Sequence, residues 1–186
     1  MAVFIDKDGT LVEDIPYNVK PGLIRFNPGA GMGLKKLKDH GFLLVLISNQ
    51  SGVARGYFRE SALEAVKQRI QELLQESGCQ MDAFYFCPHH PDGVVTKYAI
   101  SCPCRKPEPG MLLKAAKDLD IDLARSWMIG DILNDVEAGN SAGCKTILID
   151  NGNETEWHRS EKRKPTATAA GISDAAEIIL HEPAWA

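Results

Sequence analysis

MAVFIDKDGT, residues 1–10, joins a short apolar run to two carboxylates. Ala2 to Ile5 are long enough for a short buried strand, and Asp6 and Asp8 follow it directly. Because these two residues are two apart, their side chains would point to the same side of an extended backbone. Ligands of open α/β sheets bind at the carboxyl ends of the strands. The run therefore predicts a first strand that ends in a cluster of reactive carboxylates.

Plainer interpretations of this run also exist. A strand followed by an acidic surface turn explains residues 2–9 equally well. The pattern Asp-x-Asp-Gly also occurs in calcium loops, but no Glu stands nine residues after Asp8. The rest of the chain has to decide between a surface turn and a chemical site.

Apolar runs and helical patterns alternate along the rest of the chain. Strands are predicted over residues 2–5, 42–47, 83–86, 126–129 and 145–149, and helices over 29–40, 59–77, 108–119, 134–142 and 173–180. Residues 11–28, 87–107 and 152–168 are interpreted as loops. This alternation is typical of an α/β fold with a doubly wound parallel sheet. We expect one domain over residues 1–186, with no large cap domain and an elaborated loop at 87–107.

Polar side chains follow three of the predicted strands at the point where each strand ends. These clusters are Asp6 with Asp8, Ser48 with Asn49, and Asp131 with Asp135. Lys106 lies between the third strand and the next helix and can reach the same region. Because all carboxyl ends of a parallel sheet lie at one edge, we expect the clusters to converge. One polar turn can arise by chance, but several with complementary chemistry indicate a site.

The combined residues suit phosphoryl transfer. Asp6 can attack phosphorus, and Asp8 can protonate the leaving alcohol and later deprotonate a water molecule. Asp6, Asp131 and the backbone carbonyl of Asp8 offer oxygen ligands for Mg²⁺, which would offset the repulsion between Asp6 and a phosphate dianion. Lys106 and Ser48 can hold the phosphoryl oxygens. Taken singly, Lys106 would be a surface lysine and Ser48 a helix N-cap, but the joint pattern favours a site.

Four short motifs resemble those of the haloacid-dehalogenase-like hydrolases and occur in the order of that family. They are DKDGTL at 6–11, SN at 48–49, KP at 106–107 and GDILND at 130–135. The resemblance implies a Rossmann-like core, an aspartyl-phosphate intermediate on Asp6, and Asp8 as general acid and base. It also implies a catalytic Mg²⁺ bound by Asp6, Asp8 and Asp131, with Asp135 supporting these ligands from behind.

The loop at 87–107 carries a second metal pattern. A Cys₃His set for a closed tetrahedral zinc site is formed by Cys87, His89, Cys102 and Cys104. His90 competes with His89 as the nitrogen ligand, and a loop of free thiols is the alternative. A zinc ion here would be structural, and it would order a long loop that ends at Arg105 and Lys106.

Longer stretches narrow the resemblance to one branch of the family. CPHHP at 87–91, CPCRKPEPGM at 102–111 and SNQSGVARG at 48–56 are similar to phosphatases that act on D-glycero-D-manno-heptose 1,7-bisphosphate. By this resemblance the substrate would contact Asp14, Tyr17, Ser48, Asn49, Gln50, Ser51, Arg105 and Lys106. Arg105 would bind the second phosphate or the sugar. The expected reaction is removal of the 7-phosphate during heptose synthesis for cell-surface lipopolysaccharide. Histidinol-phosphate phosphatases share much of the pattern, and histidinol phosphate is the alternative substrate.

Composition argues against several other classes of protein. The net charge of −4 gives no basic surface for nucleic acid, which weighs against a nucleic-acid 3′-phosphatase. No apolar run approaches a membrane span and no signal-peptide pattern is present, so we expect a cytoplasmic protein without a membrane partner. The expected partner is a small sugar phosphate, and we expect a monomer. A non-catalytic, zinc-stabilised binding module would lack a motif residue, and none is missing.

Overall fold

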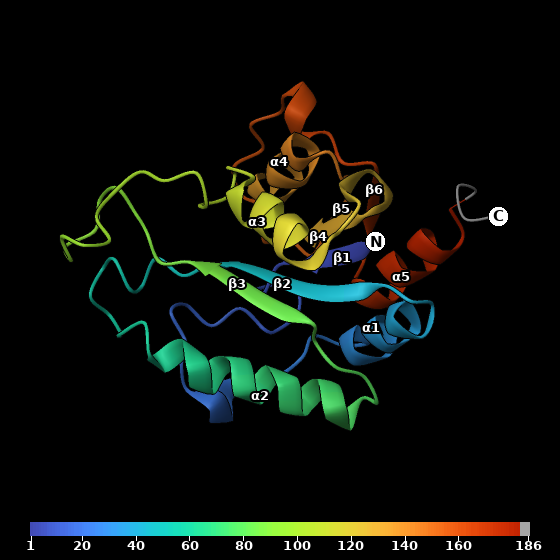
Figure 1. The fold of residues 1–186 in the computed structure, drawn as a ribbon, viewed down its shortest axis with the longest axis horizontal. Helices are drawn as coiled ribbons and strands as arrows, with labels where there is room; N and C mark the ends of the chain where they lie inside the picture. Colours follow the sequence, from blue (N-terminus) through green and yellow to red (C-terminus); the bar gives the residue numbers. More distant parts are fainter. Residues whose placement is uncertain (183–186) are drawn as a thin grey trace.

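The computed structural model describes residues 1–182, and its centre is a six-stranded parallel sheet (Figure 1). The strands are β1 (Ala2–Ile5), β2 (Leu43–Asn49), β3 (Ala83–Cys87), β4 (Trp127–Gly130), β5 (Lys145–Ile149) and β6 (Ala167–Ala169). The helices are α1 (Ala30–Asp39), α2 (Ala62–Glu76), α3 (Gly110–Leu119), α4 (Leu133–Ala142) and α5 (Ile172–Leu180). Their order in the sheet is β3-β2-β1-β4-β5-β6, which confirms the predicted doubly wound α/β fold.

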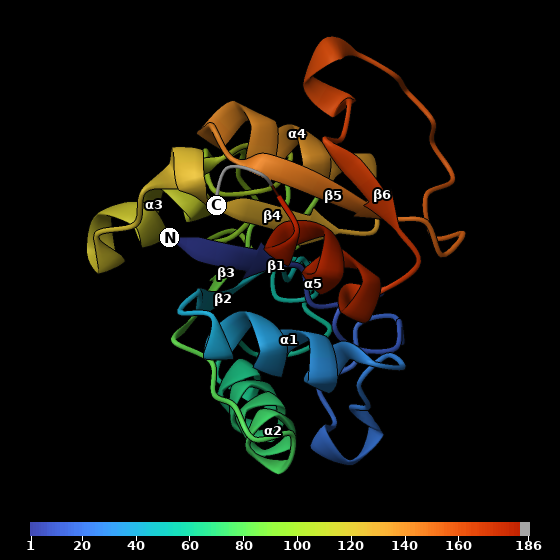
Figure 2. The same cartoon turned by 90° about the vertical axis from the view of Figure 1, so that its right-hand side faces the viewer.

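Helices cover both faces of this sheet, as Figure 2 shows: α1, α2 and α5 lie on one face, and α3 and α4 on the other. The alternation of side chains along the strands divides the apolar core accordingly. In β1, Val3 and Ile5 pack toward α1, α2 and α5, whereas Ala2 and Phe4 pack toward α3 and α4. The central strands are therefore apolar throughout, which is why they could be recognised from continuous apolar runs.

The sheet order places β1 between β2 and β4. Ile5, the last residue of β1, pairs with Leu46 of β2 and with Ile129 of β4, so β1 and β4 end within one residue of each other, whereas β2 continues for three residues to Asn49. The strands that follow β1 in the chain, β2 and β3, lie on one side of it, and β4, β5 and β6 lie on the other side. Where the strand order reverses in this way, a crevice forms at the carboxyl ends of the two central strands, here β1 and β4. This crevice is where the motif residues meet.

Several boundaries differ from the sequence prediction, and the largest differences concern β2, β6, α2 and α3. Strand β2 ends at Asn49, two residues later than predicted, so Ser48 and Asn49 belong to the strand. Residues 167–168, predicted as loop, belong to β6, an edge strand of three residues whose Ala-Thr-Ala sequence has no apolar run. Helix α2 begins at Ala62, three residues later than predicted. Helix α3 begins at Gly110 and not at residue 108, because the chain is still folded against the loop at that point. A Cβ on Gly110 would lie 2.2 Å from the carbonyl oxygen of Pro103.

Only loops cover the carboxyl edge of the sheet within residues 1–182. The segment between β1 and α1 contains a single 3₁₀ turn, Pro21–Leu23, and the segment between β3 and α3 has no regular element. Further 3₁₀ turns lie elsewhere, at Leu123–Arg125 and Glu161–Arg163. No large cap domain is present in this part of the chain, and none of its helices is long and apolar enough to cross a membrane. The predicted single domain extends to residue 186, and residues 183–186 lie outside the described part.

Candidate active site

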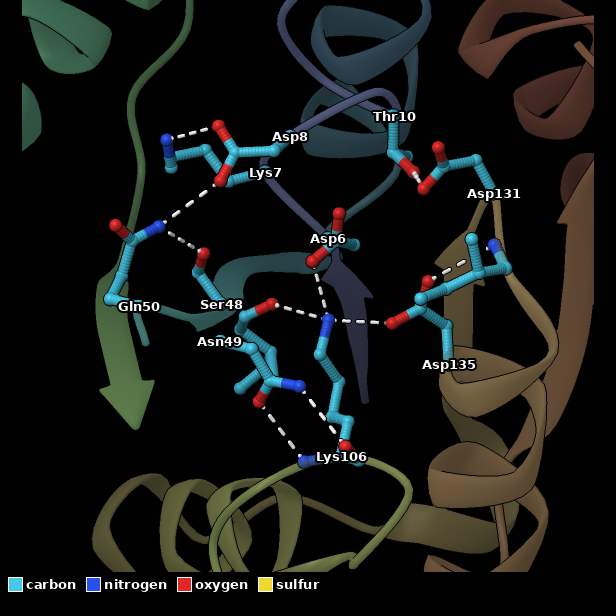
Figure 3. A network of polar contacts seen from close by, with 12 residues as sticks. Asp6, Lys7, Asp8, Thr10, Ser48, Asn49, Gln50, Lys106, Asp131 and Asp135 are labelled. Carbon is cyan, nitrogen blue, oxygen red and sulfur yellow. Dashed lines mark hydrogen bonds and ion pairs between the residues drawn. The ribbon is translucent and has the colours of Figure 1, made fainter. Parts of the chain in front are cut away.

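Three carboxylates gather at the crevice between β1 and β4 (Figure 3). Asp6 follows β1, Asp131 follows β4, and Asp135 lies in the first turn of α4. One oxygen atom of each lies within 4.8 Å of the corresponding oxygens of the other two. The exposed fractions of these residues are 8%, 4% and 0%, respectively. Carboxylates from two separate sequence motifs therefore form one buried cluster.

The ammonium group of Lys106 lies between two of these carboxylates. It forms an ion pair with Asp6 and another, at 2.6 Å, with Asp135, and it donates to the carbonyl of Ile47 at 3.1 Å. Lys106 is only 3% exposed. When all groups are ionised, three buried carboxylates against one ammonium leave an excess of two negative charges. Uncompensated buried charge is costly, so this arrangement favours a further divalent cation.

Burial makes the same carboxyl groups hard to ionise without that cation. Burial raises the pKa of Asp6 to about 7, against the opposing charge of Lys106 and with added repulsion from Asp135. Burial likewise raises the pKa of Asp131 to about 6, and repulsion from Asp6 adds to this effect. Closely spaced carboxylate oxygens are the ligands that Mg²⁺ prefers. The donor set therefore fits the ion that the sequence predicts.

Asp8 lies apart from this cluster, on the side of Asp6 opposite Asp131 in Figure 3. Its Oδ1 is paired with the buried ammonium of Lys7, and its Oδ2 accepts a hydrogen bond of 3.1 Å from Gln50 Nε2. Because β1 ends at Ile5, the side-chain alternation that the sequence suggested does not extend to Asp8. The carboxyl group of Asp8 is thus held beside the cluster, where it can exchange a proton.

Asn49 fixes the backbone that carries Lys106. Its Nδ2 donates to the carbonyl oxygen of Lys106, and its Oδ1 accepts from the Lys106 amide, each at 3.0 Å. This double contact ties the end of β2 to the segment that precedes α3. The sequence predicts substrate contact for Asn49, whereas in the structure its amide group is engaged in holding Lys106.

The other predicted substrate residues differ in their surroundings. Ser48 is buried and accepts a hydrogen bond of 2.8 Å from Gln50 Nε2, whereas Ser51 is half-buried. Tyr17 is exposed, and its ring meets that of Tyr57 edge-on with 4.6 Å between the centroids, which joins the loop before α1 to the segment after β2. Asp14 is exposed and makes no hydrogen bond or ion pair within residues 1–182. The structure thus links Tyr17 to the other loops and leaves Asp14 apart.

The segment after β5 contributes contacts that the sequence did not predict. Asn153 Nδ2 donates to Asp131 Oδ2 at 2.7 Å, and Asn151 Nδ2 donates to the carbonyl of Gly9 at 2.9 Å. Thr10 Oγ1 donates to the other oxygen of Asp131 at 2.9 Å. Gly9 has a φ of 84°, and a Cβ there would lie 2.1 Å from Asp131 Oδ2, so glycine is required. For Asn151 and Asn153, the only sequence signal for a place in the site was that their segment follows β5, a strand of the same sheet.

A second cluster of metal-ligating side chains lies at the ends of the loop after β3. Its ligand atoms, all within 4.8 Å of one another, belong to Cys87, His89, Cys102 and Cys104. The three sulfur atoms are 2.9 to 3.4 Å apart, and all five cysteines are free thiols. Tetrahedral zinc would separate sulfurs by about 3.8 Å, because each lies roughly 2.3 Å from the ion. Burial, together with the neighbouring thiols, raises the pKa of Cys87, so a cation is needed to stabilise its thiolate. The donor set fits zinc.

The ring of His90 lies outside the cysteine cluster. His89 Nδ1 is 3.4 Å from Cys104 Sγ, whereas His90 Nε2 lies 3.1 Å from Arg55 Nη2. Arg105 Nη1 donates to the carbonyl of His89 at a long 3.4 Å. The cluster therefore lies directly against the residues that precede Lys106.

Comparison with known proteins points to hydrolysis of phosphate esters, the reaction that the sequence predicts. Residues 103–175 match a family model described as HAD-hydrolase-like. The D-glycero-beta-D-manno-heptose-1,7-bisphosphate 7-phosphatase of Haemophilus ducreyi is 46% identical over 149 residues, which cover 80% of this chain and 81% of that protein. The protein of the same name from Pasteurella multocida is 39% identical, with 96% of each chain covered.

A solved structure extends the likeness to the whole chain. It is the D,D-heptose 1,7-bisphosphate phosphatase from B. bronchiseptica, complexed with magnesium and phosphate. The TM-score is 0.84 at 33% identity, and the superposition covers 98% of this chain and 99% of that one.

Proposed function

Because this chain belongs to the haloacid-dehalogenase-like hydrolases and is a phosphoric monoester hydrolase, we propose that it removes the 7-phosphate of D-glycero-D-manno-heptose 1,7-bisphosphate. The observation that carries the proposal is the buried group of Asp6, Asp131 and Asp135 around the Lys106 ammonium. This group combines a nucleophile, a cation site and a fixed positive charge. The likeness to named heptose bisphosphate phosphatases over most of the chain supports the choice of substrate.

Asp6 is the nucleophile of the proposed first step. A carboxylate oxygen of Asp6 attacks phosphorus, and the bond between phosphorus and the sugar oxygen breaks on the opposite side. Asp8 gives its proton to the departing sugar oxygen, so the phosphoryl group is left on Asp6. Lys7 and Gln50, which contact the two oxygens of Asp8, keep its carboxyl group oriented for this transfer.

Water completes the reaction in the second step. Asp8, now a carboxylate, takes a proton from the water that attacks phosphorus, and the bond to Asp6 breaks to release phosphate. Lys106 stabilises the charge on the transferred oxygens, and the hydroxyl of Ser48 donates a hydrogen bond to one of them. Mg²⁺ bound by Asp6, Asp131 and the backbone carbonyl of Asp8 would supply the positive charge that offsets repulsion between the nucleophile and a phosphate dianion.

The rest of the substrate would lie among the loops above the crevice. We propose that Arg105 binds the second phosphate or the sugar, since a guanidinium can hold a phosphate through two hydrogen bonds. Histidinol phosphate, the alternative substrate, has no second phosphate and carries an amine that Arg105 would repel. Zinc in the cysteine cluster has four protein ligands and no open position, so we propose that it is structural.

Steady-state phosphate release on the two substrates tests the choice between them. We expect kcat/KM for the heptose bisphosphate to exceed that for histidinol phosphate by at least about 10²-fold, because only the bisphosphate pairs with Arg105. Equal or higher kcat/KM on histidinol phosphate would contradict the substrate and leave the phosphatase chemistry intact.

Mg²⁺ binding should release protons, because the cation binds the ionised carboxylates. With the pKa of Asp6 at about 7 and that of Asp131 at about 6, we expect roughly one proton released per Mg²⁺ near pH 6.5 and almost none near pH 9. Without Mg²⁺, the raised pKa values of Asp6 and Asp131 mean that the folded protein binds more protons than the unfolded chain. The free energy of unfolding should therefore fall as the pH rises from about 4 to 7. Titration calorimetry in buffers of different ionisation enthalpy measures the release, and its absence near pH 6.5 would be the contrary result.

A further inference from the structure

Arg55 lies at the junction of two of the loops that cover the site. It belongs to the segment after β2, and its amide donates to the carbonyl of Ser51 at 2.9 Å. The carbonyl of the preceding residue, Ala54, accepts hydrogen bonds from the amides of Val94 and Val95 at 2.8 and 2.9 Å. The backbone at Arg55 is therefore fixed to the loop that carries the cysteine cluster.

The guanidinium of Arg55 is poorly satisfied by the protein. Its Nε is buried and has no hydrogen-bond partner. Its Nη2 faces His90 Nε2 at 3.1 Å, while the amide of Asp92 faces His90 Nδ1, also at 3.1 Å. A neutral imidazole has one acceptor nitrogen and a protonated one has none, so His90 can satisfy at most one of these donors. A buried donor without an acceptor, such as Arg55 Nε, is rare in folded proteins, and this one belongs to a positively charged group.

A second guanidinium lies close by without a carboxylate partner. Arg105 is half-buried, and burial together with the charge of Arg55 lowers its pKa. Within residues 1–182, neither Arg55 nor Arg105 forms an ion pair, and the hydrogen bond from Arg105 to the carbonyl of His89 is long, at 3.4 Å. Asp92 is directed at His90, with 3.9 Å between Oδ2 and Nδ1. Two neighbouring guanidinium groups without a carboxylate partner are typical of an anion site.

We propose that Arg55 acts with Arg105 to bind the second phosphate of the bisphosphate substrate. The inference rests on the proposed function. It adds Arg55 as a specificity-determining residue, whose guanidinium would donate hydrogen bonds to the second phosphate. Phosphate oxygens would supply the acceptor that Arg55 Nε lacks and a second one for Nη2, which competes with the Asp92 amide for His90, and the dianion would balance both guanidinium charges. Tyr17 and Tyr57, which meet edge-on, join the loop before α1 to the segment that carries Arg55.

The test compares two substrates that differ only in this phosphate: heptose 1,7-bisphosphate and heptose 7-phosphate. For Arg55→Met we expect kcat/KM on the bisphosphate to fall about 10- to 100-fold, mainly through KM. On the monophosphate we expect kcat/KM to change by less than about threefold, because heptose 7-phosphate lacks the phosphate that Arg55 would contact. Arg55→Lys should retain an intermediate value, because it keeps the charge and loses the planar donors.

Arg59→Met is the matched control, because Arg59 is an exposed arginine of the same segment. Its kinetics on both substrates should equal those of the wild type, and the zinc content of every variant should be unchanged. An Arg55→Met variant that retains wild-type kcat/KM on the bisphosphate would overturn the inference. Equal losses on both substrates would also overturn it, because they would assign Arg55 a structural role in the loop. A wild-type protein that does not hydrolyse the bisphosphate would instead reject the proposed function itself.

Discussion

An Asp6→Asn variant should lose at least about 10⁴-fold in kcat on any phosphate ester, because an amide cannot form the covalent phosphoryl intermediate. The loss should be in turnover and not in folding. Asparagine keeps the shape of the side chain and removes a carboxyl group that is costly to ionise, since burial raises its pKa to about 7. Lys106 keeps its ion pair with Asp135 in the variant. We therefore expect a melting temperature close to that of the wild type in Mg²⁺-free buffer.

Asp150→Asn provides the matched control for this experiment. Asp150 follows β5 at the same edge of the sheet, but it is exposed and outside the carboxylate cluster. Its kcat should be within about twofold of the wild-type value, as expected for a surface change. An Asp6→Asn enzyme with wild-type turnover would overturn the mechanism. Intact-protein mass spectrometry of the wild-type enzyme, quenched during turnover, should reveal the phosphorylated form.

Removal of zinc should lower kcat/KM by about 10³-fold even when Mg²⁺ is saturating. The cysteine cluster closes the loop that ends at Arg105 and Lys106, so loss of the ion would disorder Arg105 and loosen the segment that carries Lys106. Loss of a single well-placed donor to a developing anion typically costs about 10²- to 10³-fold. Asn49 still holds the backbone of Lys106, so a measurable residual activity should remain.

The experiment requires chelation, proof of zinc loss by elemental analysis, and then Mg²⁺ addition before the assay. Amide hydrogen exchange over residues 87–107 should rise in parallel with the loss of activity, and Zn²⁺ should restore both. Cys104→Ser should reproduce the effect genetically. Cys79→Ser should not, since Cys79 lies outside the cluster. Full activity after verified zinc removal would show that the loop is not a positioning device.

Much of the site could be predicted because its parts lie at the ends of apolar strands. Val3 to Ile5 and the later apolar runs of the interior strands are buried on both faces, so their pattern indicated a parallel sheet. The parallel sheet in turn placed Asp6 and Asp131 at one edge. Spacing also grouped Cys87 with His89 and Cys102 with Cys104, because the two members of each pair are only two residues apart in the chain. These inferences needed only local sequence and one rule of topology.

The remaining contacts depend on the path of loops that carry no periodic signal. Asn153 reaches Asp131 only because the chain after β5 turns back over the crevice. Strand β6 exists only because β5 offers an edge for pairing, since its own three residues have no strand pattern. Arg55 becomes noticeable only when its unsatisfied donors are seen. Each of these features is set by distant residues, which local propensity does not encode.

The order of the strands has a consequence for how the enzyme is made. Asp6, the proposed nucleophile, directly follows β1, whereas Asp131, Asp135 and Asn153 lie in the last third of the chain. A nascent chain that ends before β4 holds Asp6 without the residues that would gather a cation around it. Under the proposed mechanism, products of translation that end before β4 therefore have no phosphatase activity, because the cation site forms only when the two halves of the sheet meet.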